Sequence, residues 1–309
     1  MNEYVTVREL MDAMKLELLA GAGGLDKKIT SDMISRPGLE FAGFYDYFDS
    51  KRMLLVGSKD ATFLHKQGPE IIRRNLDYIF SQDIPCIVFS RNVIINPIFF
   101  EMGNKYNTAV LRMDLPTTAT SSKLYVYLQD KLAERISVHG TLMDIGGMGT
   151  LIIGKSGIGK SETAHDLIKR GHQLVADDLV EIMEREPGNL IGTSPNILKR
   201  YMEIRGIGIV DVISMFGAAS FRDKKMIRLV VELEAWDQNK YYDRLGIDEQ
   251  KAKYFNTEIP KVTIPVMPGR NVALLVESAA MNEKLKYLGT NAAKEFVQKI
   301  NENANARNK

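Results

Sequence analysis

The sequence predicts an α/β protein with two domains, and three observations support this prediction. The chain has 309 residues, and at roughly 150 residues per domain this length favours two domains. Hydrophobic residues make up 45% and charged residues 26% of the chain, which is typical of globular proteins and argues against a largely disordered chain. Strand-like apolar runs alternate with helix-like stretches, which is the pattern of an α/β fold.

In residues 1–127 we expect a small N-terminal α/β domain with a regulatory or structural role. Thr6 and Glu9 fit a capping box, which predicts a helix that runs to about Leu16. The single cysteine, Cys86, lies in an apolar run and is expected to be a buried thiol. The other elements predicted here are strands at Cys86–Phe89, Val93–Ile95 and Ala109–Arg112 and a helix at Pro69–Phe80.

A domain boundary is predicted at Pro116–Ser122, where small polar residues follow an apolar strand. Residues 128–309 would form the second domain, and we expect catalysis to take place there. The elements predicted for it are helices at Lys123–Glu134, Ser161–Arg170, Ser278–Leu288 and Asn291–Asn301 and strands at Thr150–Ile153, Leu229–Leu233 and Val272–Val276.

The charge and hydropathy of the chain exclude several classes of function. The 41 Lys and Arg residues nearly balance the 39 Asp and Glu residues, whereas nucleic-acid binders usually carry a clear basic excess. No apolar run approaches the roughly 18 residues of a membrane span, and the N-terminus lacks the features of a secretory signal. We therefore expect a cytoplasmic protein with neither a nucleic-acid nor a membrane partner.

The most informative stretch is a glycine-rich loop that matches the pattern G-x-x-x-x-G-K-[ST] without exception. Glycines allow the backbone to aim several N–H groups at phosphate oxygens, and a helix that follows adds its N-terminal dipole. We expect Lys160 to reach the outer phosphates and Ser161 to bind Mg²⁺. The alternative is a chance glycine-rich turn. The residues predicted to bind phosphate are Gly154, Lys155, Ser156, Gly157, Ile158, Gly159, Lys160 and Ser161.

Two adjacent carboxylates, Asp177 and Asp178, follow an apolar strand shortly after this loop. The short spacing argues against a generic GTPase or motor ATPase. Because successive residues of a strand point to opposite faces, one carboxylate could bind Mg²⁺ while the other acts as a general base. Repulsion between like charges would raise the pKa of one of them. The alternative is that the pair is an exposed turn.

Several motifs together resemble the HPr kinase/phosphorylase family. The resemblance spans nearly the whole chain, with the motifs in the family's order. It rests on Ser35–Gly43, Val138–Gly140, the glycine-rich loop followed by Glu162, Gly171–His172, Ala176–Asp178, Met202–Ile209 and Pro265–Asn271.

This resemblance implies a function in both directions of one reaction. ATP, and often pyrophosphate, would phosphorylate a serine of HPr, the small phosphocarrier of the bacterial sugar phosphotransferase system. In reverse, inorganic phosphate would attack the seryl phosphate and yield pyrophosphate. The resemblance further implies control of carbon catabolite repression, fructose 1,6-bisphosphate as an effector, a homohexamer, and a catalytic domain related to the nucleotide fold of phosphoenolpyruvate carboxykinase.

The resemblance also implies a role for each matching residue. Asp178 would deprotonate the serine in the kinase direction and return the proton in the reverse direction. Ser161 and Glu203 match magnesium positions, where Asp177 would assist.

Three further residues, His139, Lys160 and Arg244, match catalytic positions. From the residues alone, His139 would be read as a hydrogen-bonded strand-end histidine and Arg244 as a surface or salt-bridged arginine. The segment Met202–Asp211 matches a region needed in both directions. A region needed chiefly for dephosphorylation corresponds to Pro265, Val266, Met267, Pro268, Gly269 and Arg270.

Two other functions remain compatible with the loop and the carboxylate pair alone. One is a small-molecule kinase or carboxykinase-like enzyme on the same nucleotide fold, which phosphorylation of HPr would exclude. The other is a nucleotide-sensing regulator with little catalysis, for which Asp178→Asn would have little effect.

Overall fold

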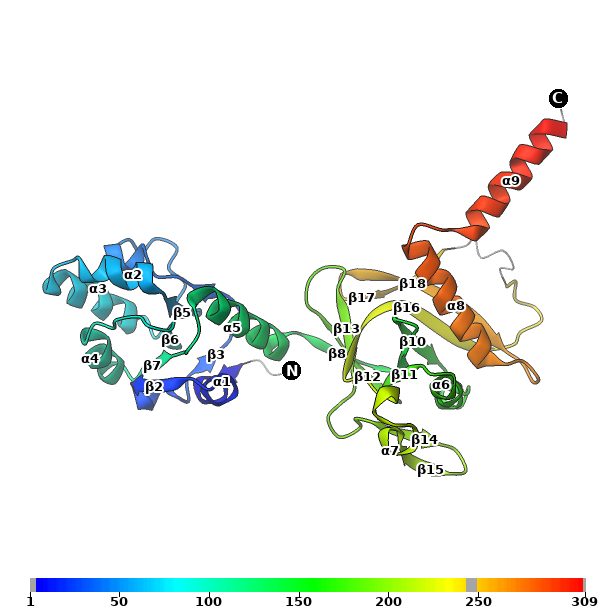
Figure 1. Ribbon diagram of the computed structural model, residues 1–309, viewed down its shortest axis with the longest axis horizontal. Helices are drawn as coiled ribbons and strands as arrows, with labels where there is room; N and C mark the ends of the chain where they lie inside the picture. The colour runs from blue at the N-terminus through cyan, green and yellow to red at the C-terminus, as the bar shows by residue number, and fades with distance from the viewer. Residues whose placement is uncertain (1–3, 243–248, 308–309) are drawn as a thin grey trace. The chain divides into compact units, whose positions relative to one another are not determined.

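The computed structural model describes residues 4–242 and 249–307. The chain divides into two compact units, Met1–Ala133 and Glu134–Lys309 (Figure 1). The expected boundary segment Pro116–Ser122 is not a linker, because helix α5 (Thr117–Leu132) begins inside it, with Pro116 at its N-cap. Small polar residues and proline are as typical of helix starts as of linkers, so their cluster predicted a break where the structure has a helix.

Within the described residues, the N-terminal unit is built on a five-stranded sheet in the order β2-β7-β6-β5-β4. Strands β4 to β7 are parallel, and β2 is antiparallel to β7. The capping box is confirmed, since the Glu9 N–H donates to Thr6 Oγ1 over 3.2 Å. The strands of the unit are β1 (Val5–Thr6), β2 (Glu17–Ala20), β3 (Lys28–Ile29), β4 (Ile34–Ser35), β5 (Met53–Val56), β6 (Cys86–Phe89) and β7 (Ala109–Arg112).

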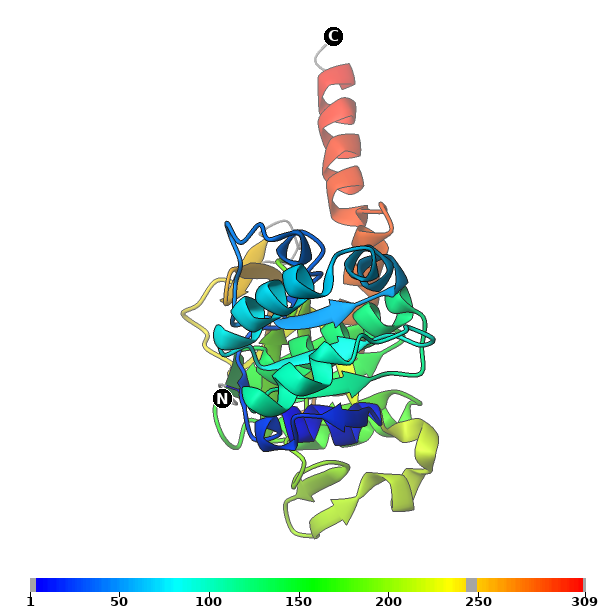
Figure 2. The same cartoon turned by 90° about the vertical axis from the view of Figure 1, so that its left-hand side faces the viewer.

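Helices cover both faces of this sheet, which explains why its inner strands β5 and β6 are apolar at every position. On one face, Leu54 and Ile87 pack under α2, α3 and α4; on the other, Leu55 and Cys86 pack under α1 and α5. Figure 2 shows α1 in dark blue and the cyan helices on opposite sides of the strands. The helices are α1 (Val7–Met14), α2 (Ser58–His65), α3 (Pro69–Ser81) and α4 (Ile98–Lys105), with 3-10 turns η1 (Ala22–Gly24) and η2 (Glu40–Ala42).

One predicted strand of this unit, Val93–Ile95, is wrong. These residues lie in an irregular connection between β6 and α4. Val93 is nevertheless buried in the core beneath the helices. A short apolar run does not fix conformation, and in this run Val93 is buried without pairing to a neighbouring strand, while Ile94 is exposed.

The C-terminal unit contains, among the described residues, a nine-stranded sheet in the order β11-β9-β10-β16-β13-β12-β8, with β18 and β17 extending it from β16. Strands β10, β16 and β18 are parallel, and β9 is antiparallel to both β10 and β11. Strands β10, β11, β16 and β18 therefore point the same way, and their carboxyl ends meet at one edge. The strands of this sheet are β8 (Arg135–His139), β9 (Thr141–Ile145), β10 (Met148–Gly154), β11 (Gln173–Ala176), β12 (Leu179–Glu184), β13 (Leu190–Thr193), β16 (Lys224–Ala235), β17 (Gln250–Tyr254) and β18 (Thr257–Val266).

Two cores lie on the two faces of the central strands. Ile152 and Val231 pack with residues of α6 and α8, whereas Leu151 and Val230 pack with residues of β12 and β13 (Figure 1). A hairpin of β14 (Tyr201–Ile204) and β15 (Gly208–Asp211) stands beside α6. The helices are α6 (Lys160–Lys169), α7 (Val212–Phe216), α8 (Val272–Tyr287) and α9 (Ala292–Arg307), with the 3-10 turn η3 (Ala218–Ser220). In the described part of the chain, no helix has the length and hydropathy of a membrane span.

The predicted strand Val272–Val276 is also wrong, because it forms the first turns of α8. The Asn271 side chain accepts a hydrogen bond from the Leu274 N–H over 2.9 Å and caps this helix. The apolar face continues through Val276 and Ala280, which are buried at helical spacing. A run of five apolar residues is short enough to fit either conformation, and the cap decides for the helix.

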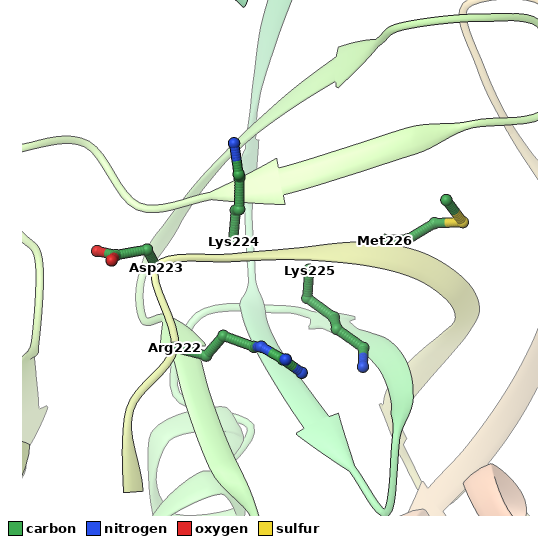
Figure 3. A pocket seen from close by; sticks show the side chains of 5 residues that line it. All are labelled: Arg222, Asp223, Lys224, Lys225 and Met226. Atoms are coloured by element: carbon green, nitrogen blue, oxygen red, sulfur yellow. The ribbon is translucent and has the colours of Figure 1, made fainter. Parts of the chain in front are cut away.

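A buried carboxylate, Asp144, ties the beginning of β16 to β9. It accepts hydrogen bonds from Lys225 Nζ over 2.7 Å and from Arg222. Figure 3 shows that Arg222 and Lys225 extend to the same side of the chain, whereas Lys224 extends to the other. Residues 222–226 line a pocket of about 550 Å³. This pocket lies at the amino end of β16, away from the edge where the carboxyl ends meet.

Candidate functional site

The predicted site segments leave the C-terminal sheet at one edge. Gly154 pairs with Leu233 on β16, and Leu233 pairs with Ile264 on β18. The glycine-rich loop and the turn that contains Arg270 therefore begin at the same level on strands two positions apart, about 10 Å at the usual strand spacing. Asp177 follows β11 on the other side of β9. The strand order thus gathers segments that are far apart in the sequence.

The loop between β10 and α6 has the backbone that its glycines require. Gly154, Gly157 and Gly159 have φ values of 150°, 80° and 101°, which side chains with a Cβ rarely adopt. A Cβ on Gly154 would lie 2.4 Å from the carbonyl oxygen of Leu233. Because Gly159 is the N-cap of α6, no side-chain cap covers the first N–H groups of this helix. Their exposure at a helix N-terminus fits the phosphates of a nucleotide.

Lys160, the first residue of α6, folds back over the loop. Its Nζ lies 3.2 Å from the Gly154 carbonyl oxygen and 3.4 Å from that of Lys155. One turn further, Thr163 Oγ1 donates to the Gly159 carbonyl over 2.7 Å. The two contacts of Nζ place the ammonium group against the loop backbone, where it can neutralise the charge of a phosphate bound there.

Asp177 is the buried member of the carboxylate pair. Its Oδ1 accepts hydrogen bonds from Thr141 Oγ1 over 2.8 Å and from Ser161 Oγ over 3.1 Å. Burial raises the pKa of Asp177, and hydrogen bonds from Thr141, Ser161 and backbone N–H groups oppose this rise. The pKa of one carboxylate is raised, as expected, but the expected cause is wrong. Burial raises the pKa of Asp177, and repulsion between the two carboxylates does not. A hydroxyl and a carboxylate that meet in this way fit the oxygen ligands that Mg²⁺ prefers.

Asp178 lies in a different environment from its neighbour. It occupies the turn between β11 and β12 with a φ of 65°, a left-handed conformation that aspartate tolerates better than most residues. Its side chain is 75% exposed, and Oδ1 lies 3.8 Å from Nδ1 of His139. The Gly140 N–H donates to the Asp178 carbonyl over 3.0 Å and fixes the turn. The two carboxylates diverge because of this turn, and not through the alternation of a strand.

Glu203 lies on β14, in the segment that matched a region needed in both directions. Its neighbours Met202 and Ile204 are buried in the core that includes α6, while Glu203 is exposed. The backbone N–H of Glu203 makes a hydrogen bond to the Asp177 carboxylate, which favours its ionised form. Within the described residues, no group of three or more His, Cys, Asp or Glu side chains could hold a metal ion by itself. A magnesium site here would therefore depend on Ser161 and on phosphate oxygens as well.

The structure does not bring all the predicted residues to the centre of this site. Arg270 is exposed in the turn after β18, where its N–H donates to the Met267 carbonyl over 3.2 Å. Arg244 lies outside the described residues. His172, in the turn after α6, has its Nε2 3.0 Å from Oε1 of Glu277, a contact with α8 away from the loop.

Two residues at the site were missed by sequence reasoning. Thr141 lies in an apolar strand, and its partner Asp177 is 36 positions away, so no local pattern points to their contact. Arg205 lies against the loop, since a Cβ on Gly157 would be 3.1 Å from its Nη1. Arg205 lies in the segment Met202–Ile209, which resembles the family. That resemblance pointed to the segment as a whole and did not distinguish Arg205 from its neighbours.

Known proteins match this chain over nearly its whole length. The family model of the HPr Serine kinase N terminus matches residues 5–128, and that of the HPr Serine kinase C-terminal domain matches residues 130–300. The chain is 45% identical over 296 residues to the HPr kinase/phosphorylase of Bacillus licheniformis, with 96% of each chain covered. It belongs to the HPr kinase/phosphorylase family. This confirms the resemblance found in the motifs.

Other members of the HPr kinase/phosphorylase family are similar to the same extent. The chain is 44% identical over 298 residues to the HPr kinase/phosphorylase of Geobacillus kaustophilus, with 96% of each chain covered. Among solved structures, that of the Hpr(Ser) kinase/phosphatase from Coxiella burnetii is 34% identical, with a TM-score of 0.48. It covers 52% of this chain and 98% of its own.

Proposed function

We propose that this protein uses ATP and Mg²⁺ to phosphorylate a serine of the phosphocarrier HPr, and that the same site runs the reverse phosphorolysis. The observation that carries the proposal is the convergence of the glycine-rich loop, the Ser161–Asp177 pair and the exposed Asp178 at one sheet edge. The acceptor follows from the names of the relatives, which are 44–45% identical over 96% of the chain.

The C-terminal unit is in this proposal a P-loop catalytic domain related to the nucleotide fold of phosphoenolpyruvate carboxykinase. Support comes from the succession of β10, loop and α6, and from the carboxylate pair on a strand that follows α6 directly. The site segments all belong to Glu134–Lys309, which leaves the N-terminal unit a regulatory or structural role.

The loop backbone would bind the phosphates, with Lys160 neutralising charge on the group in transfer. Ser161, Asp177 and Glu203 would hold Mg²⁺, which when bound supplies positive charge between the phosphates. In the described residues, the hydroxyl and the buried carboxylate are already in contact. Desolvation of Asp177 is the cost of this arrangement, and a bound cation would offset it.

Asp178 would act as the general base. Its carboxylate takes the proton of the acceptor serine as the serine oxygen bonds to the γ-phosphorus and ADP leaves. In reverse, an oxygen of inorganic phosphate attacks the seryl phosphate, the bond to the serine oxygen breaks, and Asp178 returns the proton to that oxygen. The exposure of Asp178 supports this role, because a protein substrate must reach it.

The resemblance to the family supports further parts of this proposal. His139 and Arg244 would assist catalysis, and the turn from Pro265 to Arg270 would serve chiefly dephosphorylation. Pyrophosphate would replace ATP as a donor, fructose 1,6-bisphosphate would be an effector, and the protein would assemble as a homohexamer. Its biological role would be the control of carbon catabolite repression.

One experiment tests acceptor, donor and reversibility together. Purified HPr is incubated with the protein, ATP and Mg²⁺, and phosphoserine is measured. ATP is then replaced by inorganic phosphate, and pyrophosphate is assayed. The proposal expects phosphoserine in the first step and pyrophosphate in the second. Release of free phosphate without pyrophosphate would contradict the reverse reaction, and transfer to a metabolite alone would contradict the acceptor.

A further inference from the structure

A buried hydroxyl beside the predicted magnesium site has no assigned role. Thr141 is the first residue of β9 and is fully buried. Its Oγ1 donates a hydrogen bond to Oδ1 of Asp177 over 2.8 Å. The same oxygen also accepts a hydrogen bond from Ser161 Oγ over 3.1 Å. Two hydroxyls from different elements therefore converge on one carboxylate oxygen.

We infer that Thr141 is a positioning residue, whose hydroxyl orients the Asp177 carboxylate, and through it the Ser161 hydroxyl, for a divalent cation bound with nucleotide. This inference rests on the proposed function, because it concerns the cation of that same site. It assigns no contact between Thr141 and the cation. Thr141 acts only through Asp177.

The hydrogen-bonding capacity of the groups supports this role. A serine hydroxyl has one hydrogen and two lone pairs. Because Ser161 gives its hydrogen to Oδ1 of Asp177, its lone pairs point away from Asp177 and are left for a cation. Within the described residues, Thr141 and Ser161 both donate to Oδ1 of Asp177, and backbone N–H groups of Asp178 and Glu203 add hydrogen bonds to the same carboxylate. These contacts fix the orientation of the carboxylate.

The position of Thr141 is fixed by both neighbouring strands. Thr141 pairs with Ile152 on β10, and the next residue, Leu142, pairs with Ala176, which directly precedes Asp177. A β-branched side chain in a strand has a restricted χ1. Its hydrogen bond to Asp177 holds the hydroxyl in one of the orientations that remain. When a residue that orients a metal ligand in this way is mutated, metal affinity typically falls about 10–100-fold.

The test measures binding of Mn²⁺, as a spectroscopic substitute for Mg²⁺, to the full chain with a non-hydrolysable ATP analogue. Free Mn²⁺ is counted by electron paramagnetic resonance. Thr141→Val keeps the shape and removes the hydroxyl, and we expect Mn²⁺ affinity to fall about tenfold or more. Thr141→Ser keeps the hydroxyl and should bind within about threefold of the unchanged protein, a change smaller than the lower end of that range.

A matched control lies on the adjacent strand. Thr150 is equally buried, and its Oγ1 donates to the Met148 carbonyl over 3.3 Å, away from Asp177. Thr150→Val should therefore leave Mn²⁺ affinity unchanged. Melting temperatures of all variants without divalent cations report the structural cost of each lost hydroxyl. If Thr141→Val does not fold, Thr141→Ala takes its place in the comparison with Thr141→Ser.

Three outcomes would overturn the inference: unchanged Mn²⁺ affinity in Thr141→Val, an equal loss in Thr141→Ser, or an equal loss in Thr150→Val. Failure of the proposed function would look different. In that case the unchanged protein would bind Mn²⁺ and nucleotide but would transfer no phosphate to HPr. The order of Mn²⁺ affinities among the variants would still decide the role of Thr141.

Discussion

The hydroxyl oxygen of Ser161 lies 3.1 Å from Oδ1 of Asp177, although one residue opens α6 and the other follows β11. This contact joins the glycine-rich loop to the carboxylate pair across strand β9. It also leaves a carboxylate almost entirely buried, at 3% exposure. Function and stability therefore make opposite demands on Asp177.

The first prediction concerns Asp177→Asn in the absence of divalent cations. Burial raises the pKa of Asp177, so this carboxyl group binds its proton more tightly in the folded state than in the unfolded state. Above the unfolded pKa, ionised Asp177 therefore lowers stability. An amide oxygen can still accept from Thr141 and Ser161. We expect calorimetry at neutral pH to show an equal or higher melting temperature, together with loss of Mn²⁺ binding. A clearly lower melting temperature would contradict this account.

The second prediction concerns the exposed carboxylate. Asp178→Asn removes a base but little packing, because the side chain is 75% exposed. We expect the rate of phosphate transfer to HPr to fall about 10²–10⁴-fold, while nucleotide binding, measured by calorimetry, persists. An unchanged transfer rate would remove Asp178 from the role of base. Asp223→Asn changes an equally exposed carboxylate at the opposite edge of the sheet and serves as the control.

The third prediction tests the glycine-rich loop. Gly154→Ala places a Cβ 2.4 Å from the Leu233 carbonyl oxygen at a φ of 150°, so the loop must shift. We expect a large loss of nucleotide affinity, measured by fluorescence titration. Gly188→Ala is the control, because Gly188 also has a positive φ but a Cβ there meets nothing within 4 Å. Equal losses of nucleotide affinity in the two variants would refute a specific role of the loop backbone.

The fourth prediction concerns pH and the buried Asp144. Burial alone would raise its pKa, but hydrogen bonds and charges from Lys225 and Arg222 lower it overall. A lowered pKa stabilises the folded state above the unfolded value, near pH 4, and this contribution is lost as pH falls through the folded value. Asp144→Asn should cost about 3 kcal/mol at pH 7 and less at pH 3, as measured by urea unfolding. An equal cost at both pH values would disprove the linkage.

Local patterns predicted those features that depend on neighbouring residues. The loop needs glycines where φ is positive, and a helix needs a cap, so Gly154 to Ser161 and the box at Thr6 could be read directly. Short apolar runs were less informative. Val93–Ile95 and Val272–Val276 both fit a strand pattern, but a short apolar run is equally compatible with an irregular segment or a helix, which is what the structure has at these places.

The sequence by itself therefore determined the family, the glycine-rich loop and the identity of the carboxylate pair. Only the tertiary structure decided that Asp177 is buried against Ser161 and Thr141 while Asp178 turns outward beside His139. The physical reason is that these contacts depend on strand order, direction and register. Residues from β9, α6 and the end of β11 meet only after three segments of the chain have packed side by side.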